Sequence, residues 1–234
     1  MRYLLLVLAA LGIAATPAAA QNPVPLDTRV KNFQVPRELP ECGLEAVLLR
    51  LAKETGVRIG FERTSGCRGH VASGFPEAYK PLSLVNAEVL DGISLKDVLS
   101  RIAALVPDYD WAIMEDVAVF RPSAAWKDAD DALGARVPAM RFSEAPVIRV
   151  VDSILNRRPV RHDTKEETVS IDFPGGTVLE ALNSLVRSQP AFGMWYAGTD
   201  GQRLSVWIMN VPNGSGHGVS TPIPTLLSRR NPSS

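Results

Sequence analysis

Residues 93–107 read ISLKDVLSRIAALVP, and residues 176–190 return to the same pattern as GTVLEALNSLVRSQP. The alignment superposes Ser94 on Thr177 without a gap and ends on a proline in both segments. Apolar residues recur at the i, i+3, i+4 and i+7 spacing that lines one face of an α-helix. In each segment the hydroxyl residue stands three positions before an acid, which is the signature of a helix N-cap. The two segments therefore predict equivalent helices in two copies of one unit.

The rest of the chain extends this pattern in both directions. Residues 44–55 and 147–154 have the same helical spacing; Gly56 follows the first, and Pro146 opens the first turn of the second. Period-two alternation predicts short strands between the helices. These strands lie at 33–35, 57–61, 85–89, 109–113, 117–119, 140–142, 169–173, 194–196 and 204–208.

The order of these elements predicts an α+β fold. We expect two tandem small βαββαβ(β) domains, each with two helices packed on short strands. The run KDADD at residues 127–131 interrupts the apolar rhythm between the copies. The expected organisation is a disordered lead at 21–29, a first domain at 30–122, a linker at 123–135, a second domain at 136–210 and a disordered Pro/Gly/Ser-rich tail at 211–234.

The first twenty residues have the layout of an export signal. Arg2 provides the positive start, residues 3–15 are uncharged and largely apolar, and Ala18 to Ala20 supply small residues at the cleavage site. The alternative of a retained membrane anchor is disfavoured, because the apolar run is shorter than the roughly 20 residues that span a bilayer. We expect cleavage after Ala20, a periplasmic location and no stable membrane insertion.

Composition narrows the class of protein. The chain has 234 residues, 46% of them hydrophobic, which is typical of a folded protein. Its 25 Lys and Arg balance 25 Asp and Glu. Since a dedicated nucleic-acid binder carries a strong basic excess, we expect no nucleic-acid partner.

The expected periplasmic location determines how the two cysteines are interpreted. In an oxidising compartment an even count without metal-ligand spacing favours a disulfide, here Cys42 with Cys67. The bridge would close a loop of about 25 residues and contribute about 3 kcal/mol. The alternative is that Cys67 acts as a nucleophile or ligand with His70, although zinc would need two more ligands.

A resemblance to a known family rests on residues 44–59, LEAVLLRLAKETGVRI, and residues 89–99, VLDGISLKDVL. They resemble the short N-terminal (STN) domain shared by secretins and TonB-dependent receptors, in which a helix and strand precede a strand and helix. The likeness covers about residues 30–122, and more weakly 136–210. It implies non-catalytic periplasmic modules that contact inner-membrane regulators or neighbouring secretion components. Because no pore, barrel or plug segment follows residue 210, we expect a free-standing pair of such modules.

Candidate chemistry is sparse. The segment GSGHG at 214–218 is not a nucleophile elbow, and the three histidines stand in separate regions. The aspartates of 128–131 lack the glycine and distal glutamate of a calcium loop. The basic run at 157–165 is interrupted by acids, which favours a salt-bridged loop face over an anion-binding patch. We predict no catalytic residue, metal ligand or cofactor site, and hence no enzyme.

Recognition is the remaining role. Trp126 lies in the expected linker, where it either docks the two domains or offers an aromatic contact to a partner. The final hairpin strands offer sheet edges that could accept a strand from another protein. The candidate partner-binding residues are Trp126, Val117, Val119, Leu204 and Val206.

Two functional hypotheses follow. The first is a non-catalytic adaptor that binds an unidentified envelope protein in a secretion or outer-membrane receptor complex. The alternative is a periplasmic sensor that binds a small ligand or cell-wall glycan in a cleft between the two domains. The sequence specifies neither the partner nor the oligomeric state.

Overall fold

A computed structural model describes residues 24–39, 43–63, 86–157, 167–200, 202–212 and 215–223. Several sequence predictions lie outside these residues. They are the export signal, the disulfide partners Cys42 and Cys67, and the histidines His70 and His162.

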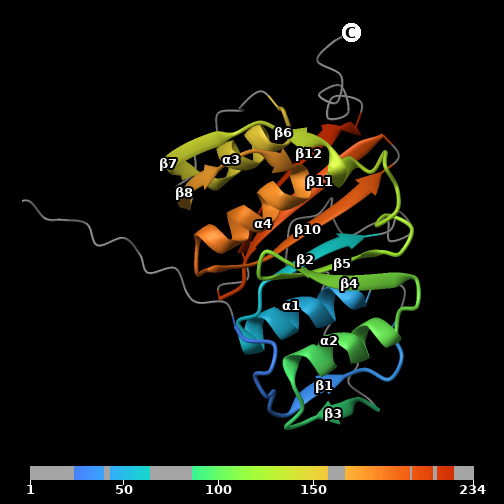
Figure 1. Ribbon diagram of the computed structural model, residues 1–234. Helices are drawn as coiled ribbons and strands as arrows, with labels where there is room; N and C mark the ends of the chain where they lie inside the picture. Colours follow the sequence, from blue (N-terminus) through green and yellow to red (C-terminus); the bar gives the residue numbers. More distant parts are fainter. Residues whose placement is uncertain are drawn as a thin grey trace, which may run out of the picture.

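One six-stranded sheet runs through the centre of the molecule, in the order β12-β11-β10-β2-β5-β4 (Figure 1). β2 is parallel to both of its neighbours, and the remaining pairs are antiparallel. The strands are β2 (Ile59–Arg63), β4 (Tyr109–Met114), β5 (Val117–Pro122), β10 (Phe192–Asp200), β11 (Arg203–Asn210) and β12 (Ser215–Pro222).

Helices cover both faces of this sheet. In Figure 1, α1 (Leu44–Thr55) and α2 (Leu95–Ala104) lie on one side, and α3 (Val147–Ile154) and α4 (Val178–Ser188) lie on the other. Two clusters of buried side chains fill the layers, which we call the first core, under α1 and α2, and the second core, under α3 and α4. Alternate residues of the central strands point into opposite cores, as the pleat requires.

Short strand pairs extend the layers. β1 (Phe33–Val35) pairs with β3 (Glu88–Leu90), β6 (Arg136–Val137) with β9 (Gly176–Thr177), and β7 (Met140–Pro146) with β8 (Thr168–Phe173). All three pairs are antiparallel.

Helix caps follow the predicted chemistry. The Ser94 hydroxyl accepts a hydrogen bond from the Asp97 backbone N–H at 3.1 Å. Thr177 and Glu180 form a complete capping box, since each side chain bonds the other residue's backbone N–H. Gly56 ends α1 with a positive φ of 75°, a conformation that suits glycine. Pro146 lies just before α3 rather than in its first turn.

The predicted α+β class is confirmed, since the described residues form four α-helices together with strands in sheets. The two halves share one sheet, because β2 of the first half pairs with β10 of the second. The register runs from Met194 opposite Ile59 to Gly198 opposite Arg63. This pairing gives the two central strands a common hydrogen-bond ladder, so the halves are joined through backbone as well as side chains.

Two expectations about irregular segments are wrong, and a third segment has more structure than a linker requires. Residues 215–222, expected in a disordered tail, form β12. In the expected disordered lead, Val24 and Leu26 pack against the first core. The expected linker contains a 3₁₀ helix at Ala132–Gly134, whose Leu133 is fully buried in the second core. Each segment has enough apolar or small residues to join a packed layer, although in none of them do apolar residues recur at the spacing that predicts a helix or strand.

Candidate functional site

The sheet leaves two outer edges, at β4 and at β12. Since α1 to α4 cover its faces, backbone groups at these edges are the recognition groups that the sheet offers. Strand addition at such an edge uses main-chain hydrogen bonds for affinity and alternate side chains for specificity.

The β4 edge presents the backbone of alternate residues. The Ser123 N–H donates to the Asp108 carbonyl at 2.8 Å, which fixes the pairing phase along the hairpin. Backbone groups of Trp111 and Ile113 therefore point away from β5. The Ile113 side chain is 41% exposed, so this edge also carries an apolar contact.

The β12 edge has a different character. The Ile223 N–H donates to the Gln202 carbonyl at 2.7 Å, so the backbones of Val219 and Thr221 bond to β11, and those of Gly216, Gly218 and Ser220 face outward. Pro222 lacks an N–H and removes one donor from this outer edge.

The predicted edge residues lie inside the sheet. β5 is paired on both sides, so the prediction that Val117 and Val119 form an open edge is wrong. β11 is also paired on both sides, and Leu204 and Val206 are fully buried in the second core. The reason is that β2 and β12 add to the outer sides of the two predicted hairpins, which local periodicity does not reveal.

The junction between the halves is tightly filled. Trp195 of β10 lies across Gly60 of β2, where an added Cβ would meet the indole at 2.3 Å. The Trp195 Nε1–H donates to the Asn183 side-chain oxygen at 2.7 Å, and the Asn183 amide donates to the Met114 carbonyl at 3.3 Å. Both side chains are fully buried. A packed tryptophan and its polar chain thus occupy the place where a cleft between domains was expected.

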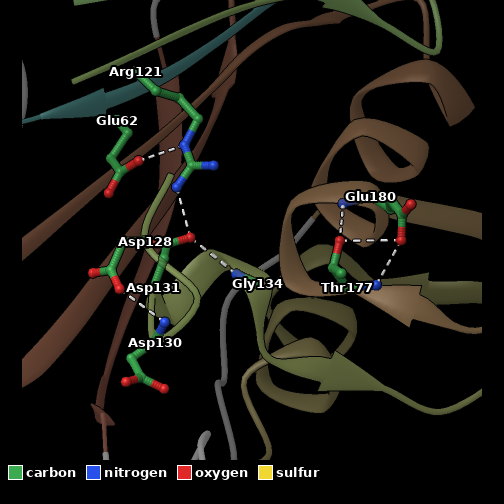
Figure 2. A network of polar contacts seen from close by, with 8 residues as sticks. All are labelled: Glu62, Arg121, Asp128, Asp130, Asp131, Gly134, Thr177 and Glu180. Carbon is green, nitrogen blue, oxygen red and sulfur yellow. Dashed lines mark hydrogen bonds and ion pairs between the residues drawn. The ribbon is translucent and has the colours of Figure 1, made fainter. Parts of the chain in front are cut away.

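A buried ion cluster ties the connector to the sheet (Figure 2). Arg121 of β5 lies between Glu62 of β2 and Asp131, and donates to each carboxylate at 2.6 Å. These side chains are 7%, 8% and 10% exposed respectively. The Asp131 carboxylate also accepts from the Gly134 N–H at 3.0 Å and so caps the 3₁₀ helix.

Burial and the neighbouring charges raise the pKa values of both Glu62 and Arg121. Burial raises the pKa of Glu62 above its usual range, and the nearby Asp131 adds to this, although the Arg121 guanidinium opposes it. Burial alone would lower the pKa of Arg121, but its two carboxylate partners raise it overall. Arg121 therefore stays charged, and Glu62 is the group that responds to pH.

Trp126 lies against this cluster. The Arg121 guanidinium stacks over its ring at 5.2 Å, and its Nε1–H donates to the Asp110 carbonyl at 3.4 Å. The ring is half-buried against the second core. These contacts fit the interpretation that Trp126 docks the connector onto the sheet.

Sequence reasoning missed Glu62 and Arg121 as a pair. They are 59 positions apart in the chain, and each stands at the end of an apolar strand pattern. The available signal was Arg121, which continues the apolar phase of Val117 and Val119, because a charge on the inward side of a strand requires a partner. The aspartates expected to form a solvated linker include that partner, Asp131.

Other predicted polar features are only partly described. Arg157 lies 3.5 Å from the buried Asp152, and the rest of the basic run falls outside the described residues. His217 Nε2, near the start of β12, lies 3.8 Å from a carboxylate oxygen of Glu167. In the part of the chain that the structure describes, no group of three His, Cys, Asp or Glu side chains is placed to hold a metal ion.

Comparisons with known proteins found no match for this chain. The chain matches no protein-family model, and neither a curated protein nor a solved structure is similar to it. Among the described residues, no helix has the length and apolar character needed to cross a membrane.

Proposed function

We propose that the chain is an exported, non-catalytic adaptor that binds an extended segment of an envelope protein at an edge of its central sheet. The observation that carries this proposal is the covering of both sheet faces by helices while β4 and β12 remain the outer strands. The zero formal net charge supports recognition by shape and backbone pairing rather than by bulk electrostatic attraction.

The resemblance to STN domains supports the cellular setting of this proposal. Such modules act in the periplasm, and the N-terminal signal pattern provides the route there. The alternative, a ligand sensor with a cleft between the halves, has less support, because Trp195 and the β2–β10 ladder fill that position.

Site-specific photo-crosslinking in cells tests the adaptor. A photoreactive residue at Ile113 samples the β4 edge, and one at Arg203 samples the β11–β12 end of the sheet. Exposed helix positions Lys96 and Arg149 serve as matched controls. We expect one envelope protein to be captured from an edge position and not from the helices. Capture of glycan alone, or equal capture from helix and edge positions, would contradict the adaptor.

Intact mass of the exported protein tests its processing. We expect a chain that begins at Gln21, and a gain of two hydrogens on reduction if Cys42 and Cys67 are bridged. A mass that retains residues 1–20 would contradict export through a cleaved signal.

A further inference from the structure

β12 is the last strand of the sheet and comes from the end of the chain. It runs antiparallel to β11, from Ser215 opposite Asn210 to Pro222 opposite Arg203. In the first half the corresponding place, beside β5, is taken by β2, which is parallel and lies between two helices in the sequence. β12 is thus a separate occupant of the outer side of β11.

Tryptophan and methionine of β11 determine which strands fit there. Gly218 lies opposite Trp207, and a Cβ at Gly218 would meet the indole at 2.2 Å. Gly216 lies opposite Met209, and a Cβ there would meet the sulfur at 2.8 Å. A strand beside β11 therefore needs glycine opposite Trp207 and favours it opposite Met209, whose flexible side chain would otherwise have to shift. Ser220 comes next on this face, and its hydroxyl accepts a hydrogen bond from Arg203 Nε at 3.1 Å.

The opposite face of β12 is imperfectly matched to its surroundings. Thr221 is fully buried, and its hydroxyl has no hydrogen-bond partner among the described residues. A buried hydroxyl without a partner opposes burial, and glycines within a strand add conformational entropy that must be lost on pairing. β12 therefore fits the shape of the β11 edge, but a segment without the buried Thr221 hydroxyl would bind there more tightly.

The geometry points to β11 as a strand-receiving edge that β12 occupies as a self-ligand. An extended partner segment with the pattern Gly-x-Gly-x-Ser, with β-branched residues at the positions of Val219 and Thr221, replaces β12 there. The backbones of Leu204 and Val206, which now bond to β12, pair with the incoming segment. The existence of an envelope partner rests on the proposed function, whereas the receiving edge can be tested without one.

A peptide of residues 215–223, SGHGVSTPI, tests the receiving edge on the full chain. We expect the fluorescently labelled peptide to bind, with a rise in anisotropy that excess unlabelled peptide reverses. The matched control, SGGHVSTPI, has the same composition but places histidine opposite Trp207, and it should not bind. A third peptide with Thr221→Val removes the buried hydroxyl, and we expect it to bind at least about threefold more tightly.

A variant of the chain tests whether β12 competes with the peptide for the β11 edge. Gly218→Val prevents β12 from seating under Trp207, so the wild-type peptide should bind this chain about tenfold more tightly than the wild-type chain. His217→Val changes the other face of β12 and should leave the affinity within about twofold. If Gly218→Val does not fold, the binding of the three peptides to the wild-type chain decides the test.

Three results would overturn the inference. They are no peptide binding to any folded chain, equal binding of the two isomeric peptides, or a wild-type dimer that the peptide dissociates, which would make a second copy the occupant. Capture experiments in cells address a different question. Peptide binding without a captured protein would contradict the adaptor alone, and capture only from Ile113 would contradict the β11 edge alone.

Discussion

Two tryptophans lie across glycines in this sheet, one at its centre and one at its edge. Trp195 covers Gly60 on the face toward the second core, and Trp207 covers Gly218 on the opposite face. Trp195 is fully buried and hydrogen-bonded to Asn183, whereas Trp207 is only half-buried. The same local contact thus joins the halves permanently at the centre and holds a replaceable strand at the edge.

The largest effect is expected from filling the central contact. Gly60→Val would place its Cβ 2.3 Å from the indole of Trp195, in a region with no free space. We expect a loss of about 3 kcal/mol or more in the free energy of unfolding, measured in urea. Gly198→Ala in β10 is the control, because its Cβ would make an ordinary 3.5 Å contact with Arg63 and should cost less than about 1 kcal/mol.

Shortening the central tryptophan should have the next largest effect. Trp195→Phe removes the donor to Asn183 and leaves that buried amide oxygen unpaired. We expect a loss of about 2 to 3 kcal/mol in the free energy of unfolding. Trp207→Phe at the edge should cost less than about 1 kcal/mol. Equal losses would show that the two contacts have the same weight in the fold.

Filling the edge contact should have a smaller and local effect. Gly218→Val clashes with the half-buried indole of Trp207 and unseats β12, which lies at the edge of the sheet and leaves the other strand pairs intact. We therefore expect about 1 kcal/mol of lost stability, with faster amide exchange confined to β12. A loss as large as that of Gly60→Val would contradict the comparison.

The smallest effect concerns pH at the centre. Glu62 lies two residues from Gly60 on the same face of β2, and burial raises its pKa above the ordinary value of 4.5. The folded chain therefore favours the protonated acid, and it loses stability as pH rises from 4.5 through the raised pKa. Glu62→Gln should remove this dependence and be the more stable chain above that window. A pH titration of urea unfolding, compared with Glu88→Gln at the exposed Arg101 ion pair, measures the difference.

The sequence predicts the helices and strands of this fold better than it predicts which strands pair with one another. Helix faces and caps, such as Ser94 with Asp97, depend on residues within one or two turns of each other, so their period is visible. The β2–β10 pairing depends on two strands from different halves, and no local pattern encodes it. β12 was mistaken for a tail because the glycines that Trp207 and Met209 require are poor strand formers.

Native-state amide exchange of the full chain, resolved by residue, tests the central claim most directly. We expect the paired amides of β2 and β10 to exchange only through global unfolding, and those of β12 to open at a much lower free energy. Independent opening of the two halves would contradict the shared sheet as the unit of stability. Protection of β12 equal to that of β10 would contradict its role as a replaceable strand.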